Sequence, residues 1–262
     1  MTEVAFNSTA SDGSYCFPAL NPGQSYTIKA DLQDGWVQTL PASGGSYSVP
    51  AISTAVTGKN FGFHKTTIVV DKVPGVGDYT VIQAAANDAI DSDTIRVHSG
   101  TYNEGVTIRK NSLNIIGEGN PEVRSTYAII LRSSNCRIEG FTFAGSTYGV
   151  YFDLGKNSNT IAGNTISGGT NGIFVYGSGD HSITNNIISG SDSGLYIYAG
   201  TANPGNTITG NTITSGGCGL FIFGKNNQIT GNTINGITQG IYIYTGSSAN
   251  NIYSNCINGL GM

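Results

Sequence analysis

Charged side chains are scarce in this sequence, and neither sign dominates. Only 11% of the 262 residues are charged, and the formal net charge is −4. From Ser182 onward the only charged residues are Asp192 and Lys225. A chain this weakly charged and mildly acidic lacks the basic patches that bind nucleic acid or an anionic membrane surface. We therefore expect no nucleic acid among its partners.

Membrane-spanning segments and paired cysteine motifs are lacking as well. No run approaches the roughly 18 consecutive apolar residues that suggest a transmembrane helix, so we expect no membrane insertion. No signal peptide is visible at Met1. The four cysteines form no CxxC motif, and they allow three disulfide pairings among which the sequence does not choose. We expect buried free thiols at Cys16, Cys136, Cys218 and Cys256.

A cluster of metal-ligating side chains is missing too. The three histidines, His64, His98 and His181, are far apart in the chain, and the two methionines are its terminal residues. Soft metals such as copper are bound by sets of Cys, His and Met side chains brought close together. The sequence therefore predicts no metal site and no cofactor.

What the chain does have is a short repeat. A glycine followed mostly by aliphatic and aromatic residues recurs at intervals of 21 to 25 residues, at Gly149, Gly172, Gly194, Gly219 and Gly240. A second motif precedes each later copy, as in Asn206-Thr-Ile-Thr-Gly-Asn-Thr-Ile213. Each unit thus contains three short extended pieces separated by Gly, Asn and Ser, and none is long enough for a helix. Repeats of roughly 20–50 residues are typical of solenoids.

These pieces predict a right-handed parallel β-helix with three strands per turn. The predicted fold class is all-β, with about six coils, an N-terminal helical cap and a small partial β-sandwich. Stacking places two isoleucine columns inside, namely Ile161, Ile183, Ile208, Ile229 and Ile252, and Ile166, Ile188, Ile213, Ile234 and Ile257. One turn position stacks asparagines that tolerate left-handed backbone and can form amide ladders, namely Asn164, Asn186, Asn211, Asn232 and Asn255.

The strand after each repeat glycine should carry two outward columns, because side chains alternate along a strand. The first column contains Tyr151, Phe174, Tyr196, Phe221 and Tyr242, and the second contains Asp153, Tyr176, Tyr198, Phe223 and Tyr244. An exposed apolar stripe of this size marks an interaction site or is covered by another part of the chain. Two interpretations stay open: ordinary cross-strand stacking, or a platform for a polysaccharide or a protein.

Residues 1–65 do not share the repeat. Short alternating segments broken by Asp-Gly, Asn-Pro-Gly and Gly-Gly predict a partial antiparallel β-sandwich there, and residues 66–262 form the β-helix domain. The segments Asp12-Gly-Ser-Tyr-Cys-Phe17 and Leu20-Asn-Pro-Gly-Gln-Ser-Tyr26 resemble the second half of a CNA-B or SdrD-type B domain. These immunoglobulin-like repeats occur in microbial and archaeal surface proteins, so the resemblance implies an extracellular location on the cell surface.

The start of the second domain carries another resemblance. Residues 78–90 are compatible with a short helix that closes the open end of the solenoid. Together with the run from Asp93 to Gly117, this segment resembles the start of pectin-lyase-like parallel β-helix proteins, including NosD-type and sugar-hydrolase-associated repeats. The likeness extends over about 78–258. It implies the fold and leaves the activity open, because that superfamily contains lyases, hydrolases, epimerases and many non-enzymes.

A catalytic centre on this fold would need clustered acids, or a base beside acids, on an outer face. Repeat alignment predicts only Arg132 beside Asp153, with Arg96 and His98 further along the same face. Neither the acidic cluster of a pectate lyase nor the several aspartates of a polygalacturonase is present. The segment Tyr176-Gly-Ser-Gly-Asp180-His181 faintly resembles alginate epimerases, but His181 aligns with Asn159, Asn206 and Asn227. We therefore interpret it as a turn residue.

The favoured hypothesis is a non-catalytic, extracellular, cell-surface module whose aromatic columns bind a polysaccharide or a neighbouring surface protein. The alternative is a polysaccharide lyase, hydrolase or epimerase that uses Arg132 and Asp153 on acidic glycans, with calcium in the lyase case. A third hypothesis is a pure spacer. No closing element is visible before Gly261-Met262, so we expect self-association through an uncapped C-terminal end.

Overall fold

The computed structural model describes residues 5–18, 20–42, 44–200, 204–235 and 238–258. The chain forms two compact units, residues 1–65 and residues 66–262. The uncapped end expected at Gly261-Met262 lies outside the described residues.

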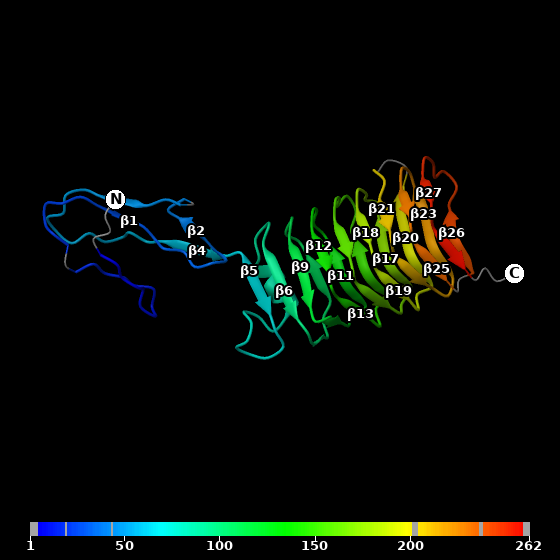
Figure 1. Cartoon of the computed structure of the whole chain (residues 1–262), viewed down its shortest axis with the longest axis horizontal. Coiled ribbons are helices and arrows are strands. Elements are labelled where there is room, and N and C mark those ends of the chain that lie inside the picture. The colour runs from blue at the N-terminus through cyan, green and yellow to red at the C-terminus, as the bar shows by residue number, and fades with distance from the viewer. Residues whose placement is uncertain (1–4, 19, 43, 201–203, 236–237, 259–262) are drawn as a thin grey trace. The chain divides into compact units, whose positions relative to one another are not determined.

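The larger unit is a parallel β-solenoid whose strands form three sheets (Figure 1). Sheet 1 has nine strands: β5 (Thr67–Val70), β6 (Thr94–His98), β9 (Asn114–Glu118), β12 (Arg137–Glu139), β15 (Thr160–Ala162), β18 (Ser182–Thr184), β21 (Thr207–Thr209), β24 (Gln228–Thr230) and β27 (Asn251–Tyr253). Sheet 2 has eight: β7 (Thr101–Tyr102), β10 (Glu122–Val123), β13 (Thr142–Ala144), β16 (Thr165–Ser167), β19 (Ile187–Ser189), β22 (Thr212–Thr214), β25 (Thr233–Asn235) and β28 (Cys256–Asn258). Sheet 3 has seven: β8 (Val106–Ile108), β11 (Tyr127–Leu131), β14 (Tyr148–Phe152), β17 (Asn171–Tyr176), β20 (Ser193–Gly200), β23 (Cys218–Gly224) and β26 (Gln239–Ile243).

The solenoid has about eight turns, as the eight strands of sheet 2 show, so the predicted six coils are too few. The first turns lack the Asn-and-Gly repeat and were undercounted for that reason. Every neighbouring pair of strands within the three sheets is parallel and pairs with its equivalent one turn along. The predicted three-strand coil is therefore confirmed.

The predicted isoleucine columns form part of the core. Ile161, Ile183 and Ile208 are in direct register and fully buried. The last described turn differs, because Ile257 is 39% exposed. The repeat glycines leave room for these side chains: a Cβ on Gly194 would come within 2.8 Å of the carbonyl oxygen of Gly219 and would collide with Ile213.

A buried asparagine ladder joins sheet 1 to sheet 2, as predicted. Asn186 donates its side-chain amide to Oδ1 of Asn211 at 3.0 Å, and Asn211 donates to Oδ1 of Asn232 at 3.0 Å. The left-handed backbone belongs to the residue before each ladder asparagine, as at Gly210 with φ of 68°. The asparagines are therefore selected for their amides rather than for the turn conformation.

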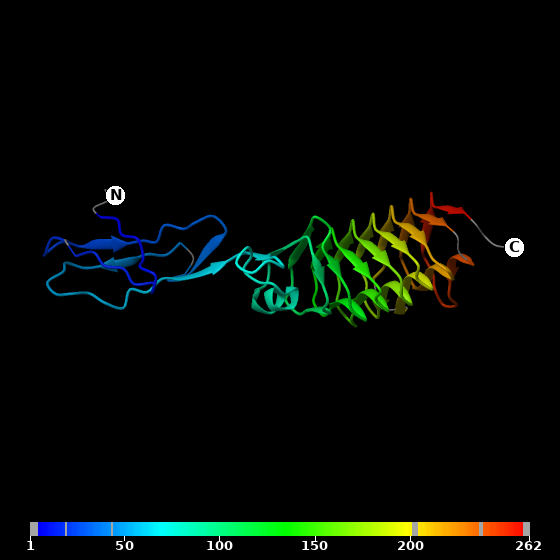
Figure 2. The same ribbon diagram turned by 90° about the horizontal axis from the view of Figure 1, so that it is seen from below.

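The predicted helix is present as α1 (Ile82–Asp88), which packs against β5, β6 and β8 at the N-terminal end of the stack (Figure 2). Glu104 accepts hydrogen bonds from the backbone amides of Ile82 and Gln83, which caps the helix from a distant part of the chain. Gln83 in turn bonds both the backbone N–H and the C=O of Thr107. The side-chain amide of Gln83 thereby hydrogen-bonds the backbone of β8, which is the edge strand of sheet 3.

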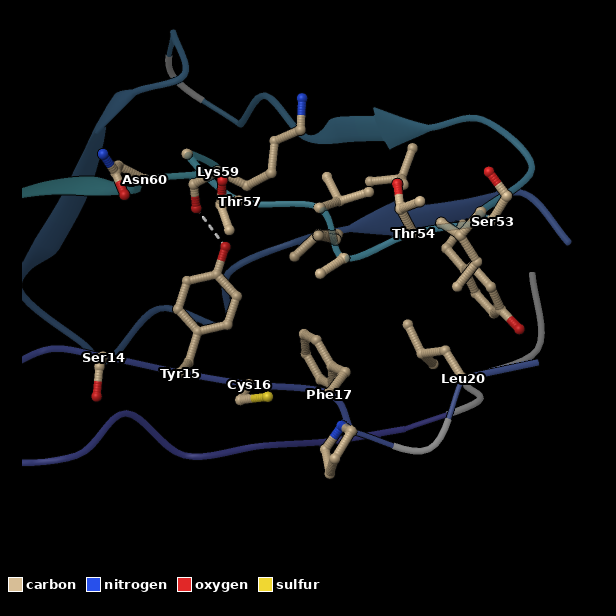
Figure 3. A pocket seen from close by; sticks show the side chains of 18 of the residues that line it. Ser14, Tyr15, Cys16, Phe17, Leu20, Ser53, Thr54, Thr57, Lys59 and Asn60 are labelled. Atoms are coloured by element: carbon tan, nitrogen blue, oxygen red, sulfur yellow. Dashed lines mark hydrogen bonds between the residues drawn. The ribbon is translucent and has the colours of Figure 1, made fainter. Parts of the chain in front are cut away.

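The smaller unit contains two antiparallel pairs: β1 (Tyr26–Ile28) with β3 (Tyr47–Val49), and β2 (Trp36–Leu40) with β4 (Gly62–Lys65). One of the alternating segments expected to be strands, Ser14–Phe17, does not form a strand. Among the described residues of this unit, only Gln38 and Val49 are buried. An open cavity of about 770 Å³, lined by aromatic and aliphatic side chains such as Tyr15, Phe17 and Leu20, occupies the place of a core (Figure 3).

All four cysteines are free thiols. The expectation that they are buried is right for Cys136 alone, since Cys218 is half-buried and Cys16 and Cys256 are exposed. Burial raises the pKa of the Cys136 thiol, whose Sγ lies 3.3 Å from Ser133 Oγ. This side chain is a packing element of the core.

Candidate functional site: an aromatic face

The outer face of sheet 3 carries the predicted aromatic columns. Each outward ring follows an inward aliphatic residue, so that burial of Ile173 and Val175 holds Phe174 on the outside. Parallel pairing then sets each ring directly beside the ring one turn along, as Phe174 is beside Tyr196. The fold thus converts a repeated sequence position into a continuous surface.

The first column is one uninterrupted stack of five rings. Ring centroids are 5.4 Å apart between Tyr151 and Phe174 and 5.2 Å apart between Phe174 and Tyr196. The stack continues from Tyr196 to Phe221 at 4.2 Å and from Phe221 to Tyr242 at 5.4 Å. Neighbouring planes differ by 10 to 27°. The rings therefore form one continuous row of nearly parallel rings along the solenoid axis.

The second column runs parallel to the first and is more exposed. Tyr176 and Tyr198 stack with centroids 6.1 Å apart, and Phe223 lies 5.2 Å from Tyr198 and 5.3 Å from Tyr244. Tyr198 is 43% exposed and Tyr244 is 47% exposed. Rings that are half in contact with neighbours and half in contact with water have a low ordering cost on binding.

A third column was missed by the sequence reasoning. Tyr127 and Tyr148 stack with centroids 4.9 Å apart, and both contact the ring of Tyr151 edge-on at 5.8 Å. The sequence does contain part of the pattern that would reveal this column, since Tyr148 directly precedes the repeat glycine Gly149. Later turns have no aromatic residue in this column, so the repeat pattern hid it; the residues there are Asn171, Ser193, Cys218 and Gln239.

At the N-terminal end of the face, Arg132 lies beside Asp153, as the repeat alignment predicts. Arg132 donates from Nε to Oδ2 of Asp153 at 3.0 Å, and Oδ1 of Asp153 accepts the backbone amide of Leu154. Asp153 is the only carboxylate in the three outward columns of sheet 3 as far as they are described. A single acid that is occupied by an arginine and an amide does not supply an acid–base pair.

The placement of Arg96 and His98 on this face is wrong. Both belong to β6 of sheet 1, where Arg96 pairs with Glu118. Nδ1 of His98 lies 2.7 Å from Oδ2 of Asp71. These residues form a separate polar surface, because the early turns carry no repeat from which their sheet could be assigned.

Tyr151 and Tyr196 of the first column remain protonated hydroxyl donors at neutral pH. Burial raises the pKa of Tyr151, and the negative charge of Asp153 adds to this effect. Burial is also the main cause that raises the pKa of Tyr196. The face therefore offers the outward edges of stacked rings together with the neutral hydroxyl groups of Tyr151 and Tyr196.

His181, interpreted above as a turn residue, lies in line with Asn159 and Asn206 and takes part in their hydrogen-bond ladder. Its Nδ1 accepts the backbone amide of Asn159 at 3.1 Å, in the position that an asparagine Oδ1 takes in other turns. Nε2 must then carry the proton and donate to Ser178 Oγ at 3.0 Å. Burial lowers the pKa of His181 to about 4, so the ring is neutral and unavailable for surface chemistry.

Metal ligands do not converge in the part of the chain that the structure describes. No group of three or more His, Cys, Asp or Glu side chains there is arranged to hold a metal ion. The same described residues contain no helix long and apolar enough to cross a membrane.

Comparisons with known proteins give one family and one solved structure. The profile of the family described as "Periplasmic copper-binding protein (NosD)" matches residues 86–260. A solved structure of a pectin methylesterase from Aspergillus niger, in deglycosylated form, aligns at 14% identity and a TM-score of 0.30, covering 71% of this chain and 86% of that chain. The comparison with curated proteins finds no match. Since the family profile extends over most of the β-solenoid, this chain belongs to the NosD family of parallel β-helix proteins.

Proposed function

We propose that this protein is a non-catalytic carbohydrate-binding module, and that a polysaccharide chain lies along the aromatic face of sheet 3. The observation that carries the proposal is the continuous stack from Tyr151 to Tyr242, beside a second column with rings up to 47% exposed. A neighbouring surface protein is the competing occupant.

The chemistry of sugars fits this surface. A pyranose ring has apolar C–H groups that pack against the edges of aromatic rings, and hydroxyl groups at its rim that bond to tyrosine hydroxyls. Strands repeat at roughly 4.8 Å, so the face offers an equivalent ring at each turn to successive units of a polymer. Because the solenoid is rigid, these rings are already ordered before the polysaccharide binds, which lowers the entropy cost of binding.

The test is a binding screen with single polysaccharides, followed by variants of the second column. Tyr198→Ala combined with Tyr244→Ala should weaken binding strongly in affinity electrophoresis. The same should hold for Tyr196→Ala with Tyr242→Ala, with a melting temperature within a few degrees of wild type. Tyr253→Ala is the matched control, since Tyr253 is 54% exposed but lies on sheet 1. Equal binding by all variants would reject the platform and favour a spacer.

The enzymatic alternative has one observation in its favour, the ion pair of Arg132 with Asp153 at the end of the face. An assay of product release from pectate, alginate and hyaluronan with calcium present tests it. Turnover by the wild type that disappears in Asp153→Asn and in Arg132→Ala would replace binding with catalysis as the function.

Copper, which the family's description names, does not fit the described residues. Both nitrogens of His181 are used by Asn159 and Ser178 in the buried ladder. His98 faces Asp71 on one side, and its Nε2 lies 3.5 Å from Glu118 on the other. These donors point to different partners and do not surround a common point. We assign no copper chemistry to this chain.

For the smaller unit we propose a partial immunoglobulin-like sandwich of the CNA-B or SdrD-B type, and for the whole chain an extracellular location at the cell surface. Two antiparallel pairs, and an open cavity lined by aromatic and aliphatic side chains beside β1 and β3, support the sandwich. A high-resolution structure in which the two pairs do not pack face to face would contradict it. Cell fractionation with an antibody against the chain tests the location.

We also propose that the C-terminal turns associate with a second copy. Ile243 is 47% exposed on β26 and Ile257 is 39% exposed on β28, the outermost strands of sheets 3 and 2. Light scattering should detect a dimer that Ile243→Lys reduces to a monomer. A monomeric wild type at high concentration would refute this.

A further inference from the structure

We propose that the polysaccharide bound by the aromatic face is anionic, and that Arg109 binds its acid group at the N-terminal end of the face. The inference rests on the proposed carbohydrate binding and specifies its substrate class. It starts from a residue that the sequence reasoning did not single out.

Arg109 continues the second column toward the N-terminus. Parallel hydrogen bonds run from the amide of Asp153 to the carbonyl of Leu131 and from the amide of Arg132 to the carbonyl of Ile108. Arg109 follows the buried Ile108 as Arg132 follows the buried Leu131. The column therefore reads Arg109, Arg132 and Asp153 before its rings begin.

The charges at this end do not balance. Asp153 pairs with Arg132, whereas Arg109 is exposed and has no carboxylate within 4.0 Å among the described residues. Asp91 accepts the backbone amide of Asn111, two residues further along the chain than Arg109. Like charges at equivalent positions of neighbouring strands destabilise a sheet. Two guanidinium groups on adjacent turns with one carboxylate leave room for a second anion.

The chemistry of guanidinium selects the ligand. A planar fork of N–H donors binds carboxylate or sulfate groups through two parallel hydrogen bonds, which a neutral hydroxyl cannot reproduce. Sugar rings stacked on Tyr148 and Tyr151 would bring a substituent acid group toward this column. Uronates and sulfated sugars both have the required charge.

The experiment compares three polymers: polygalacturonate, its carboxyl-reduced neutral form, and dextran sulfate. Arg109→Gln should lower the affinity for the anionic polymer by about tenfold, as expected for a charge-assisted hydrogen bond, and leave the neutral one unchanged. Arg137→Gln, which removes an equal charge from sheet 1, is the control. If Arg109→Gln loses affinity for polygalacturonate, the bound anion is a uronate carboxylate. If it loses affinity for dextran sulfate, the bound anion is a sulfate group.

A second variant makes the inference sharper. Asp153→Asn removes the negative charge beside Arg132 and should tighten binding of the anionic polymer severalfold, and this gain should shrink at high salt. Equal losses in Arg109→Gln and Arg137→Gln, or equal affinity for the neutral and anionic polymers, would overturn the inference. Neutral binding that still depends on Tyr198 and Tyr244 would leave the carbohydrate platform intact. Binding independent of those tyrosines would instead reject the platform itself.

Discussion

Acid should destabilise this protein through one buried side chain, His181. The ring is buried between turns, and its Nδ1 and Nε2 are engaged by Asn159 and Ser178. It also packs on Phe152, with ring centroids 4.2 Å apart. Protonation would place a charge in this interior and remove the acceptor that the amide of Asn159 needs.

The direction and size of this change in stability follow from the pKa of His181. Burial lowers the pKa of His181 to about 4 in the folded state, against the ordinary value of 6.5 that the unfolded chain takes. The unfolded chain therefore binds the proton first as the pH falls. The free energy of unfolding that the neutral ring of His181 contributes is fully present above pH 6.5. It is lost between about pH 6.5 and 4, and the total loss is about 3 kcal/mol at 1.36 kcal/mol per pKa unit.

The perturbation is His181→Asn, which restores the ladder asparagine. Urea unfolding at pH 7.5, 5.5 and 4.0 should show that the variant loses less stability than wild type on acidification. The difference between the two should approach the full value at pH 4. His64→Asn, outside the solenoid, controls for the loss of one histidine. Parallel pH profiles for wild type and His181→Asn would refute the reasoning, and so would a wild type that is equally stable at pH 7.5 and 4.0.

The remaining predictions concern the core and the turns. Ile208→Asp places an unpaired charge at a fully buried position and should cost several kcal/mol in urea unfolding, whereas Thr209→Asp, which points outward from the same strand, should cost little. Asn211→Leu leaves the amide of Asn186 without its acceptor and should cost about 2–3 kcal/mol; an unchanged midpoint would show that the ladder is dispensable. Gly194→Ala collides with a neighbouring carbonyl and should lower the melting temperature measured by calorimetry, and a tolerated alanine would show that the turns can move apart.

Part of the candidate site could be predicted from the sequence because it repeats. The rings of Phe174 and Tyr196 occupy equivalent positions in equal turns, so stacking them in register needed no further information. The pair of Arg132 with Asp153 followed from the same alignment. Tyr127 and Arg109 were missed, since their turns depart from the repeat.

The sequence by itself determined the solenoid, its inward isoleucines and its outward rings. The physical reason is that alternation along a strand and burial of one face are local consequences of residue type and spacing. The number of turns, the sheet to which Arg96 belongs and the capping of α1 by Glu104 were decided only by the tertiary structure. These features depend on which distant segments pair, and in the early turns no repeated residue specifies that pairing.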